Sequence, residues 1–168
     1  MPLTSRSRWL AFLVAVLALP LMVSAQGTAQ SANASSPDLV GSWRLESWTL
    51  ADGSPRCSEE DGGVSGLIVY TSDGHMSAQL GCSGMDMSDL NSLSPQALQG
   101  RLSRRHFSYY GPYTLDRSAQ TVTHHVEGSS STAFVGSDQV RSFVFEGLDR
   151  LVLSPDGGRQ KLLWLRNR

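Results

Sequence analysis

Two adjacent histidines, His124 and His125, are the residues of this 168-residue chain that first suggest chemistry. Imidazole transfers protons and binds metals near neutral pH. Neighbouring residues of a strand point to opposite faces, so the two rings cannot hold one ion together, and one of them must point inward. His124 shares its face with Val122 and Val126, which favours His124 as the inward ring. Two roles fit this pattern: a core histidine satisfied by a neighbouring hydroxyl or carboxylate, and a pocket histidine that orients a ligand or transfers a proton.

Arg141 is the second candidate, because it alternates with Phe143 and Phe145 and so places a cation on an apolar face. A buried arginine must be paired with a protein carboxylate or with an anionic ligand, whereas an arginine at a strand's start could be solvated at the rim. Tyrosines and a further histidine near strand ends could complete a pocket mouth. The residues predicted to bind a ligand are Tyr70, His75, Tyr110, Tyr113, His124, Arg141 and Phe143, and the candidates for catalysis are His124, His125 and Arg141.

Other chemistries find little support in the sequence. The four histidines include no pair spaced to bind jointly on one element, so neither a metal site nor a cofactor is predicted. The sequence contains no nucleophile elbow, phosphate-binding glycine loop or pair of catalytic carboxylates. Lys and Arg number 14 against 15 Asp and Glu, without a dense basic cluster, which argues against a nucleic-acid partner.

The N-terminal residues predict export. Residues 1–25 have the features of a signal peptide: Arg6 and Arg8, an apolar run over 10–23, and small residues before a cleavage site after Ala25. The run is shorter than the roughly 20 residues that span a bilayer, so no stable membrane span is expected after cleavage. Residues 26–37 are small and polar and predict a flexible linker, which leaves one domain over 38–168. The protein is therefore expected in the periplasm or outside the cell.

The two cysteines, Cys57 and Cys82, both belong to the part predicted to be exported. An even pair in an oxidising compartment is typical of a disulfide, whereas a reactive thiol or a metal ligand would need neighbours that neither cysteine has. Such a bridge closes a loop of about 25 residues and contributes roughly 3 kcal/mol to stability.

Short segments rich in β-formers, separated by turn residues, predict an all-β domain of eight antiparallel strands in up-and-down order. In the first strand, Trp43 and Leu45 are expected on one face and Trp48 on the other. Ser94 before Pro95 predicts a short helix that reaches about Ser103, between the third and fourth strands, and an insertion there would pack across one mouth of a barrel. The predicted strands are residues 41–50, 65–71, 75–80, 107–115, 120–127, 139–146, 150–154 and 161–166.

Seven segments in this order and spacing make the chain resemble bacterial and fungal lipocalin-like domain proteins. They are residues 39–45 (LVGSWRL), 66–70 (GLIVY), 73–77 (DGHMS), 109–113 (YYGPY), 121–125 (TVTHH), 136–141 (GSDQVR) and 163–166 (LWLR). The resemblance covers the whole predicted domain and implies a closed barrel with an internal pocket, without one agreed activity. It also implies structural roles for Gly41, Trp43 and Arg166, with Arg166 covering the indole of Trp43 at the closed end. Trp164 shares a strand face with Arg166 and is expected to belong to the same packing cluster. The chain departs from the family at Cys82, at residues 85–87 (MDM) and in its export signal.

Three functions remain open from the sequence. The first is an exported lipocalin-like protein that binds a small apolar or amphipathic molecule in its barrel. The second is an isomerase-type or cyclase-type enzyme that uses a pocket histidine with Arg141 and a tyrosine, which requires these side chains to converge in the lumen. The third is a structural envelope protein whose barrel is filled by its own side chains, which a large exposed apolar patch would favour.

Overall fold

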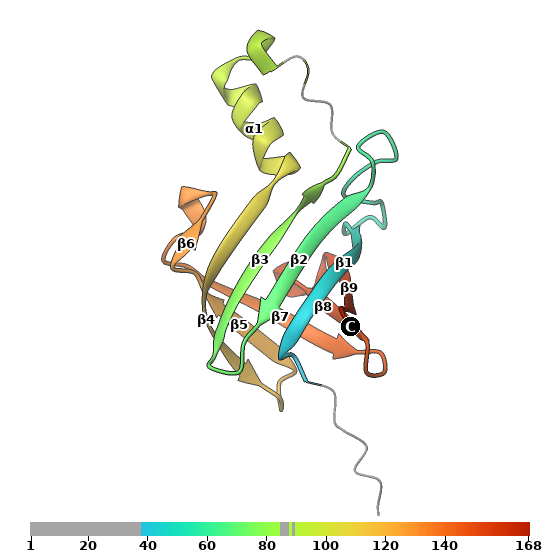
Figure 1. Ribbon diagram of the computed structural model, residues 1–168, viewed down its shortest axis with the longest axis vertical. Coiled ribbons are helices and arrows are strands. Elements are labelled where there is room, and N and C mark those ends of the chain that lie inside the picture. Colours follow the sequence, from blue (N-terminus) through green and yellow to red (C-terminus); the bar gives the residue numbers. More distant parts are fainter. Residues whose placement is uncertain (1–37, 85–87, 89) are drawn as a thin grey trace, which may run out of the picture. The chain divides into compact units, whose positions relative to one another are not determined.

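The protein forms a closed antiparallel β-barrel. Its structure, a computed structural model, describes residues 38–84, 88 and 90–168; the predicted leader, the predicted linker and residues 85–87 lie outside the described residues. Sequential strands pair with one another, and the sheet closes where β3 (His75–Cys82) pairs with β4 (Phe107–Asp116) (Figure 1). The predicted eight-stranded up-and-down barrel is therefore confirmed.

Six more strands complete the barrel wall, and their bounds differ from the predicted ones by a few residues at the ends. They are β1 (Gly41–Thr49), β2 (Val64–Tyr70), β5 (Thr121–His125), β7 (Asp138–Phe145), β8 (Arg150–Ser154) and β9 (Lys161–Arg166). A two-residue strand that the sequence did not predict, β6 (Gly128–Ser129), pairs with β4 beside Tyr109 and Tyr110. Three single-turn 3₁₀ helices lie in the connections: η1 (Leu90–Ser92), η2 (Thr132–Phe134) and η3 (Asp156–Gly158).

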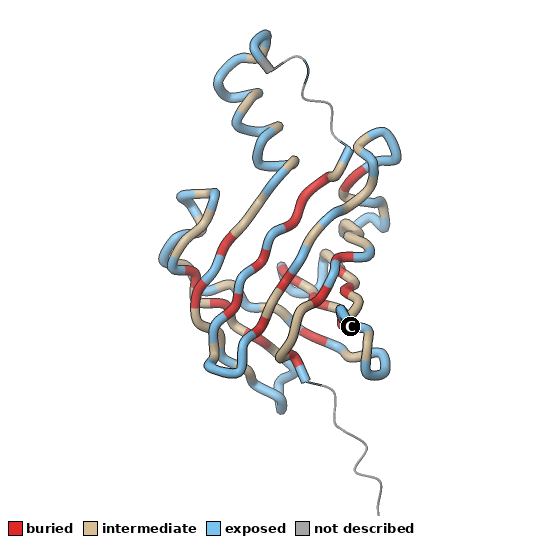
Figure 2. The backbone as a smooth tube through the Cα atoms, viewed as in Figure 1, coloured by how far each residue is buried: buried red, intermediate tan, exposed pale blue. Residues whose placement is uncertain are grey.

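The alternation of side chains along the strands builds the core. In β3, Met76, Ala78 and Leu80 are buried while the residues between them are exposed, as the period of a strand with one covered face requires. Figure 2 shows this alternation of buried and exposed residues along the strands. The buried apolar side chains of the eight wall strands form one cluster inside the barrel.

The first strand departs from strict alternation, and this corrects the face expected for Trp48. The pairing of β1 with β9 is irregular between Leu45 and Ser47, so the alternation shifts by one residue there. Trp48 consequently lines the barrel interior, on the same side as Trp43, instead of facing outward. An apolar–polar pattern does not reveal such a bulge, because the bulge depends on how the partner strand pairs.

One end of the barrel is closed by Trp43 and Arg166. The indole of Trp43 is fully buried and donates to the carbonyl of Leu39 at 2.8 Å. The guanidinium of Arg166 lies 4.0 Å from the centre of that ring and donates to the carbonyls of Asp38, Val40 and Leu148. A Cβ atom on Gly41 would lie 2.8 Å from this guanidinium, and the φ of +129° at this position disfavours residues other than glycine. The arrangement is the one that the resemblance implied.

The other end of the barrel carries the disulfide and the helix. Cys57 and Cys82 are bonded, as predicted, and the bond ties the connection after β1 to the end of β3. The predicted helix is α1 (Pro95–Arg105); Ser94 caps it by accepting from the backbone N–H of Ala97, and it ends two residues later than expected.

Helix α1 does not form the expected lid. It has no buried residue and extends away from the barrel beyond β3 and β4 (Figure 1).

Within the part of the chain that is described, no helix combines the length and apolar character that crossing a bilayer needs.

Candidate functional site

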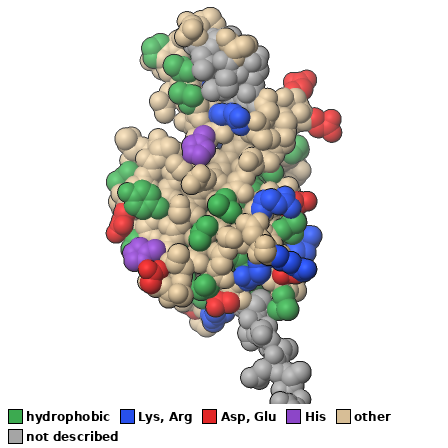
Figure 3. All heavy atoms as spheres, in the orientation of Figure 1, with side chains coloured by type: hydrophobic (Ala, Val, Ile, Leu, Met, Phe, Trp, Pro, Cys, Tyr) green, Lys and Arg blue, Asp and Glu red, His purple; other side chains and the backbone are tan. Residues whose placement is uncertain are grey.

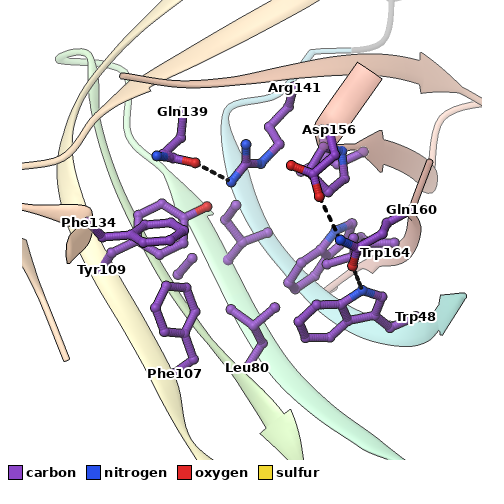
Figure 4. Close-up of a pocket in the computed structure, with 15 residues that line it drawn as sticks. Trp48, Leu80, Phe107, Tyr109, Phe134, Gln139, Arg141, Asp156, Gln160 and Trp164 are labelled. Carbon is purple, nitrogen blue, oxygen red and sulfur yellow. Dashed lines mark hydrogen bonds between the residues drawn. The ribbon is translucent and has the colours of Figure 1, made fainter. Parts of the chain in front are cut away.

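A cavity of about 150 Å³ occupies the half of the barrel opposite the Trp43–Arg166 end. Its walls are mostly apolar and rich in aromatic rings, and Figure 4 shows these side chains converging on one space. An apolar cavity of this size admits a single small ring. The lining residues are Trp48, Ile68, Ala78, Leu80, Phe107, Tyr109, Phe134, Gln139, Arg141, Leu153, Pro155, Asp156, Gln160, Leu162 and Trp164.

A second, outer chamber of about 280 Å³ adjoins this inner cavity. The two spaces share the side chains of Trp48, Leu80, Phe107 and Phe134, which form an apolar boundary between them. The outer chamber is bordered by the last turn of α1 and by Arg56, whose guanidinium lies 5.3 Å from the centre of the Trp48 ring.

Two hydrogen bonds in series hold the Trp48 ring between the two spaces. Its indole N–H donates to Oε1 of Gln160 at 2.8 Å, and Nε2 of Gln160 donates to the carboxylate of Asp156 at 2.7 Å (Figure 4). Because both ends of the Gln160 amide are engaged, the indole is fixed in one orientation. The wall of the cavity is thus formed before any ligand arrives.

Two polar side chains of β7, Gln139 and Arg141, point into the cavity from the wall opposite Trp48 (Figure 4). The guanidinium of Arg141 donates to Oε1 of Gln139 at 3.2 Å and to the carbonyl of Val140 at 3.0 Å. Arg141 forms no ion pair with a described carboxylate. The hydroxyl of Tyr109 points toward this guanidinium from β4.

Beneath Tyr109, a buried histidine connects two tyrosines. The Tyr109 hydroxyl lies 2.9 Å from Nδ1 of His124, and the Tyr70 hydroxyl lies 2.8 Å from Nε2 of the same ring. His124 is 1% exposed, and Tyr70 and Tyr109 are buried as well. Of the three, only Tyr109 lines the cavity. The cluster therefore lies directly below the cavity, and Tyr109 is the member that contacts the cavity space.

Burial keeps the members of this cluster uncharged. Burial, and next the charges of Arg141 and His125, lowers the pKa of His124 from 6.5 to about 3. Burial also raises the pKa of Tyr70 and of Tyr109; the nearby Arg141 cation opposes the rise at both hydroxyls. A neutral imidazole has one N–H and one bare nitrogen. One tyrosine therefore donates to the ring while the other accepts from it.

The structure brings only one of the seven predicted ligand-binding residues, Arg141, to the cavity wall. Tyr70, His124 and Phe143 lie in the core below it. The Tyr113 hydroxyl donates to the carbonyl of Thr71, and its ring packs edge-on against Tyr70, away from the cavity.

The remaining candidates point outward. Tyr110 is 56% exposed on the outer face of β4, and His75 is exposed beside Asp73 at the turn before β3. His125, a candidate for proton transfer, also faces outward, with Nδ1 2.7 Å from the carboxylate of Asp138 and Nε2 3.1 Å from the Thr114 hydroxyl. His124 and His125 thus lie on opposite faces, as the strand period required.

Several cavity residues were missed by sequence reasoning. Phe107 and Tyr109 share one face of β4 by alternation, and Gln139 shares a face with Arg141, so the strand period could have found these three. Phe134 lies on a 3₁₀ turn, and Trp48 follows a bulge, so no period identifies them. Trp164, predicted to be structural, also lines the cavity, and its buried indole N–H has no partner among the described residues.

Surface charge and possible metal ligands add no second site. On the face seen in Figure 3, basic and acidic side chains are interspersed. Among the described residues, no three His, Cys, Asp or Glu side chains gather in a way that could hold a metal ion. The hollow half of the barrel is the strongest candidate site.

Fold and cavity together define a small closed β-barrel with an internal chamber, the architecture of lipocalin-type proteins. The model of the lipocalin-like domain family matches residues 40–165, and the chain belongs to this family.

Solved structures with similar barrels include a redesigned β-barrel and a DUF4847 family protein from Bacteroides vulgatus. Each is 12% identical to this chain over 77% of its length; the matches cover 92% and 94% of those chains, with TM-scores of 0.42 and 0.44. A comparison with curated proteins found no match.

Proposed function

We propose that the protein binds a small apolar or amphipathic molecule in the hollow half of its barrel, after export to the periplasm or the cell exterior. The observation that carries this proposal is the aromatic-lined cavity, whose wall is held in place by the Trp48–Gln160–Asp156 hydrogen bonds. A pocket with apolar walls and a few polar groups is typical of small-molecule sites. The Cys57–Cys82 disulfide is consistent with an oxidising compartment.

Retention of a ligand tests this proposal directly. The protein without residues 1–25 is purified without detergent and examined by native mass spectrometry for a co-purifying molecule. An apolar fluorescent probe, 1-anilinonaphthalene-8-sulfonate, is then titrated into the delipidated protein. Bound small molecule or a saturable rise of probe fluorescence is the expected result. An empty protein that takes up no probe would favour the third function, a barrel filled by its own side chains.

A cavity-filling variant shows where the probe binds. Ala78 lines the cavity and is buried, so Ala78→Leu places extra volume inside it. Val144 is 50% exposed on the outer face of β7, and Val144→Leu adds one methylene group there as the matched control. Ala78→Leu is expected to weaken probe binding while Val144→Leu leaves it unchanged. Equal binding by both variants would place the probe outside the barrel.

A second candidate function, an enzyme that moves a proton, is favoured by one observation. The Tyr109 hydroxyl faces the cavity and is bonded to the neutral His124 ring, with the Arg141 cation nearby. In this arrangement Tyr109 would give its hydroxyl proton to a bound ligand and take a proton back from the ligand, and the Arg141 cation would stabilise the phenolate formed between the two steps. Incubation of any recovered ligand with the protein and with Tyr109→Phe, followed by mass spectrometry and NMR in D₂O, tests this role. Isotope exchange or isomerisation lost in Tyr109→Phe supports catalysis, and unaltered ligand supports binding alone.

A further inference from the structure

The charge of Arg141 has no protein counterpart inside the barrel. Among the described residues that line the inner cavity, Arg141 is the one cation. It donates to neutral acceptors, the carbonyl of Val140 and the amide oxygen of Gln139, and the neutral Tyr109 hydroxyl also lies beside it. The one acidic lining residue, Asp156, is exposed and accepts a hydrogen bond from Gln160 instead of pairing with Arg141. A guanidinium has five N–H donors, so several of those on Arg141 remain for a ligand.

The groups around Arg141 cannot neutralise it either. Tyr109 keeps its proton because burial raises its pKa, and His124 below it is neutral, so neither supplies a negative charge. Arg141 is half-buried, so solvent reaches part of its charge, but the side of the guanidinium that faces the cavity meets no anionic group among the described lining residues except the exposed Asp156. A second donor in the same wall, the indole N–H of Trp164, is buried without an acceptor among the described residues. The cavity therefore offers a ligand free N–H donors on Arg141 and Trp164, for which the described residues supply no acceptor.

The position of Arg141 sets the orientation of a ligand. Gln139 precedes it on the mouth side of β7, and Phe143, which follows on the same face, is already part of the filled core. Arg141 is thus at the inner end of the cavity, whereas the side chains between the cavity and the outer chamber are apolar. A polar group would lie deep and an apolar group nearer the opening.

We propose that the cavity selects ligands bearing one carboxylate, which lies against Arg141 while the apolar part extends past Trp48 and Phe107 into the outer chamber. The planar fork of a guanidinium matches the two oxygens of a carboxylate. This inference rests on the proposed function, because it specifies which small molecules the same cavity takes. Neutral molecules of the same shape bind more weakly, and the acid group enters first.

Calorimetric titration with two matched probes, octanoate and octan-1-ol, tests the inference on the protein without residues 1–25. The variants are Arg141→Gln, which removes the cavity cation, and Arg150→Gln, which removes an outward arginine that pairs with Glu146. We expect octanoate to bind the unaltered protein more tightly than octan-1-ol. Arg141→Gln should weaken octanoate at least about 10-fold, as the loss of a charge-assisted bond predicts, and change octan-1-ol less than about threefold. Arg150→Gln should change neither affinity.

The outcomes separate this inference from the proposed function. Octan-1-ol binding to Arg141→Gln at unaltered affinity shows that the variant's cavity is intact. Octanoate that binds Arg141→Gln as well as the unaltered protein, or Arg141→Gln weakening both probes alike, would overturn the carboxylate assignment and leave apolar binding standing. Failure of both probes to bind the unaltered protein would overturn both proposals together.

Discussion

The buried ring of His124 predicts a specific pH dependence of stability. In the folded protein burial and the charges of Arg141 and His125 lower its pKa from 6.5 to about 3. The unfolded chain therefore binds a proton on this ring below about pH 6.5, whereas the folded chain binds it only near pH 3. Because the unfolded state holds more protons in this window, the free energy of unfolding falls as the pH falls from about 6.5 toward 3.

The magnitude follows from the same two pKa values. Linkage predicts that His124 alone lowers the free energy of unfolding by about 2 kcal/mol between about pH 7 and pH 5. Urea unfolding followed by tryptophan fluorescence measures this quantity at several pH values in the unaltered protein and in His124→Gln. The variant is expected to be less stable at pH 7, since Tyr70 and Tyr109 lose part of their hydrogen bonding, but to lose about 2 kcal/mol less on acidification.

A control separates titration from simple destabilisation. Val122, fully buried on the same strand, is replaced in Val122→Ala, which creates a small cavity and leaves the histidine in place. This variant should be less stable at every pH and should retain the pH slope of the unaltered protein. If the unaltered protein and His124→Gln lose stability in parallel, the ring is not held neutral, and the bonded arrangement of His124 with its two tyrosines is refuted.

Three further perturbations have expected outcomes. Replacing Cys57 and Cys82 by alanine should lower the free energy of unfolding by about 3 kcal/mol, because the bridge spans 25 residues of sequence; calorimetry in the absence of reductant measures it. Arg166→Met should cost about 2 to 4 kcal/mol, since the ring contact with Trp43 and three carbonyl hydrogen bonds are lost; a urea midpoint that does not move would contradict the closed-end role. Gly111→Ala should lower the melting temperature sharply, because its Cβ would collide with the backbone carbonyl of His125 at the end of β5 and break the pairing there; an unchanged circular-dichroism melt would count against that close approach.

Much of the fold was predictable because it depends on local patterns. The alternation of Met76, Ala78 and Leu80 with polar residues already identifies a strand with one buried face, and each turn limits where the chain can go next. Ser94 before Pro95 marks the start of α1 for reasons confined to one helical turn. The bulge that turns Trp48 inward is not local, because it arises from the pairing of β1 with β9 more than 110 residues later.

The site was less predictable for the same physical reason. Arg141 could be identified from the sequence of one strand, because a cation that alternates with two phenylalanines is unusual. Alternation places Tyr109 and Tyr110 on opposite faces of β4, and the pairing with β3, where Ala78 lies opposite Tyr109, shows that Tyr109 is on the cavity side. His124 was assigned to the inner face from its neighbours, yet its two tyrosine partners come from strands 15 and 54 residues away. The size of the cavity depends on side chains from seven strands and the connections between them, which no single segment encodes.

The hollow half and the polar side chains in it are one feature. Along β7 the inward residues change from Phe145 and Phe143, which fill the closed end, to Arg141 at the inner end of the cavity and Gln139 on the mouth side. In a filled core a guanidinium without a carboxylate would carry a large desolvation cost. It is tolerable in this barrel because the space beside it admits water or an anionic ligand. Ala78→Leu fills that space with apolar volume, so it should weaken ligand binding. It should also remove the water that solvates the Arg141 guanidinium, so that the variant loses more stability than overpacking alone would cause.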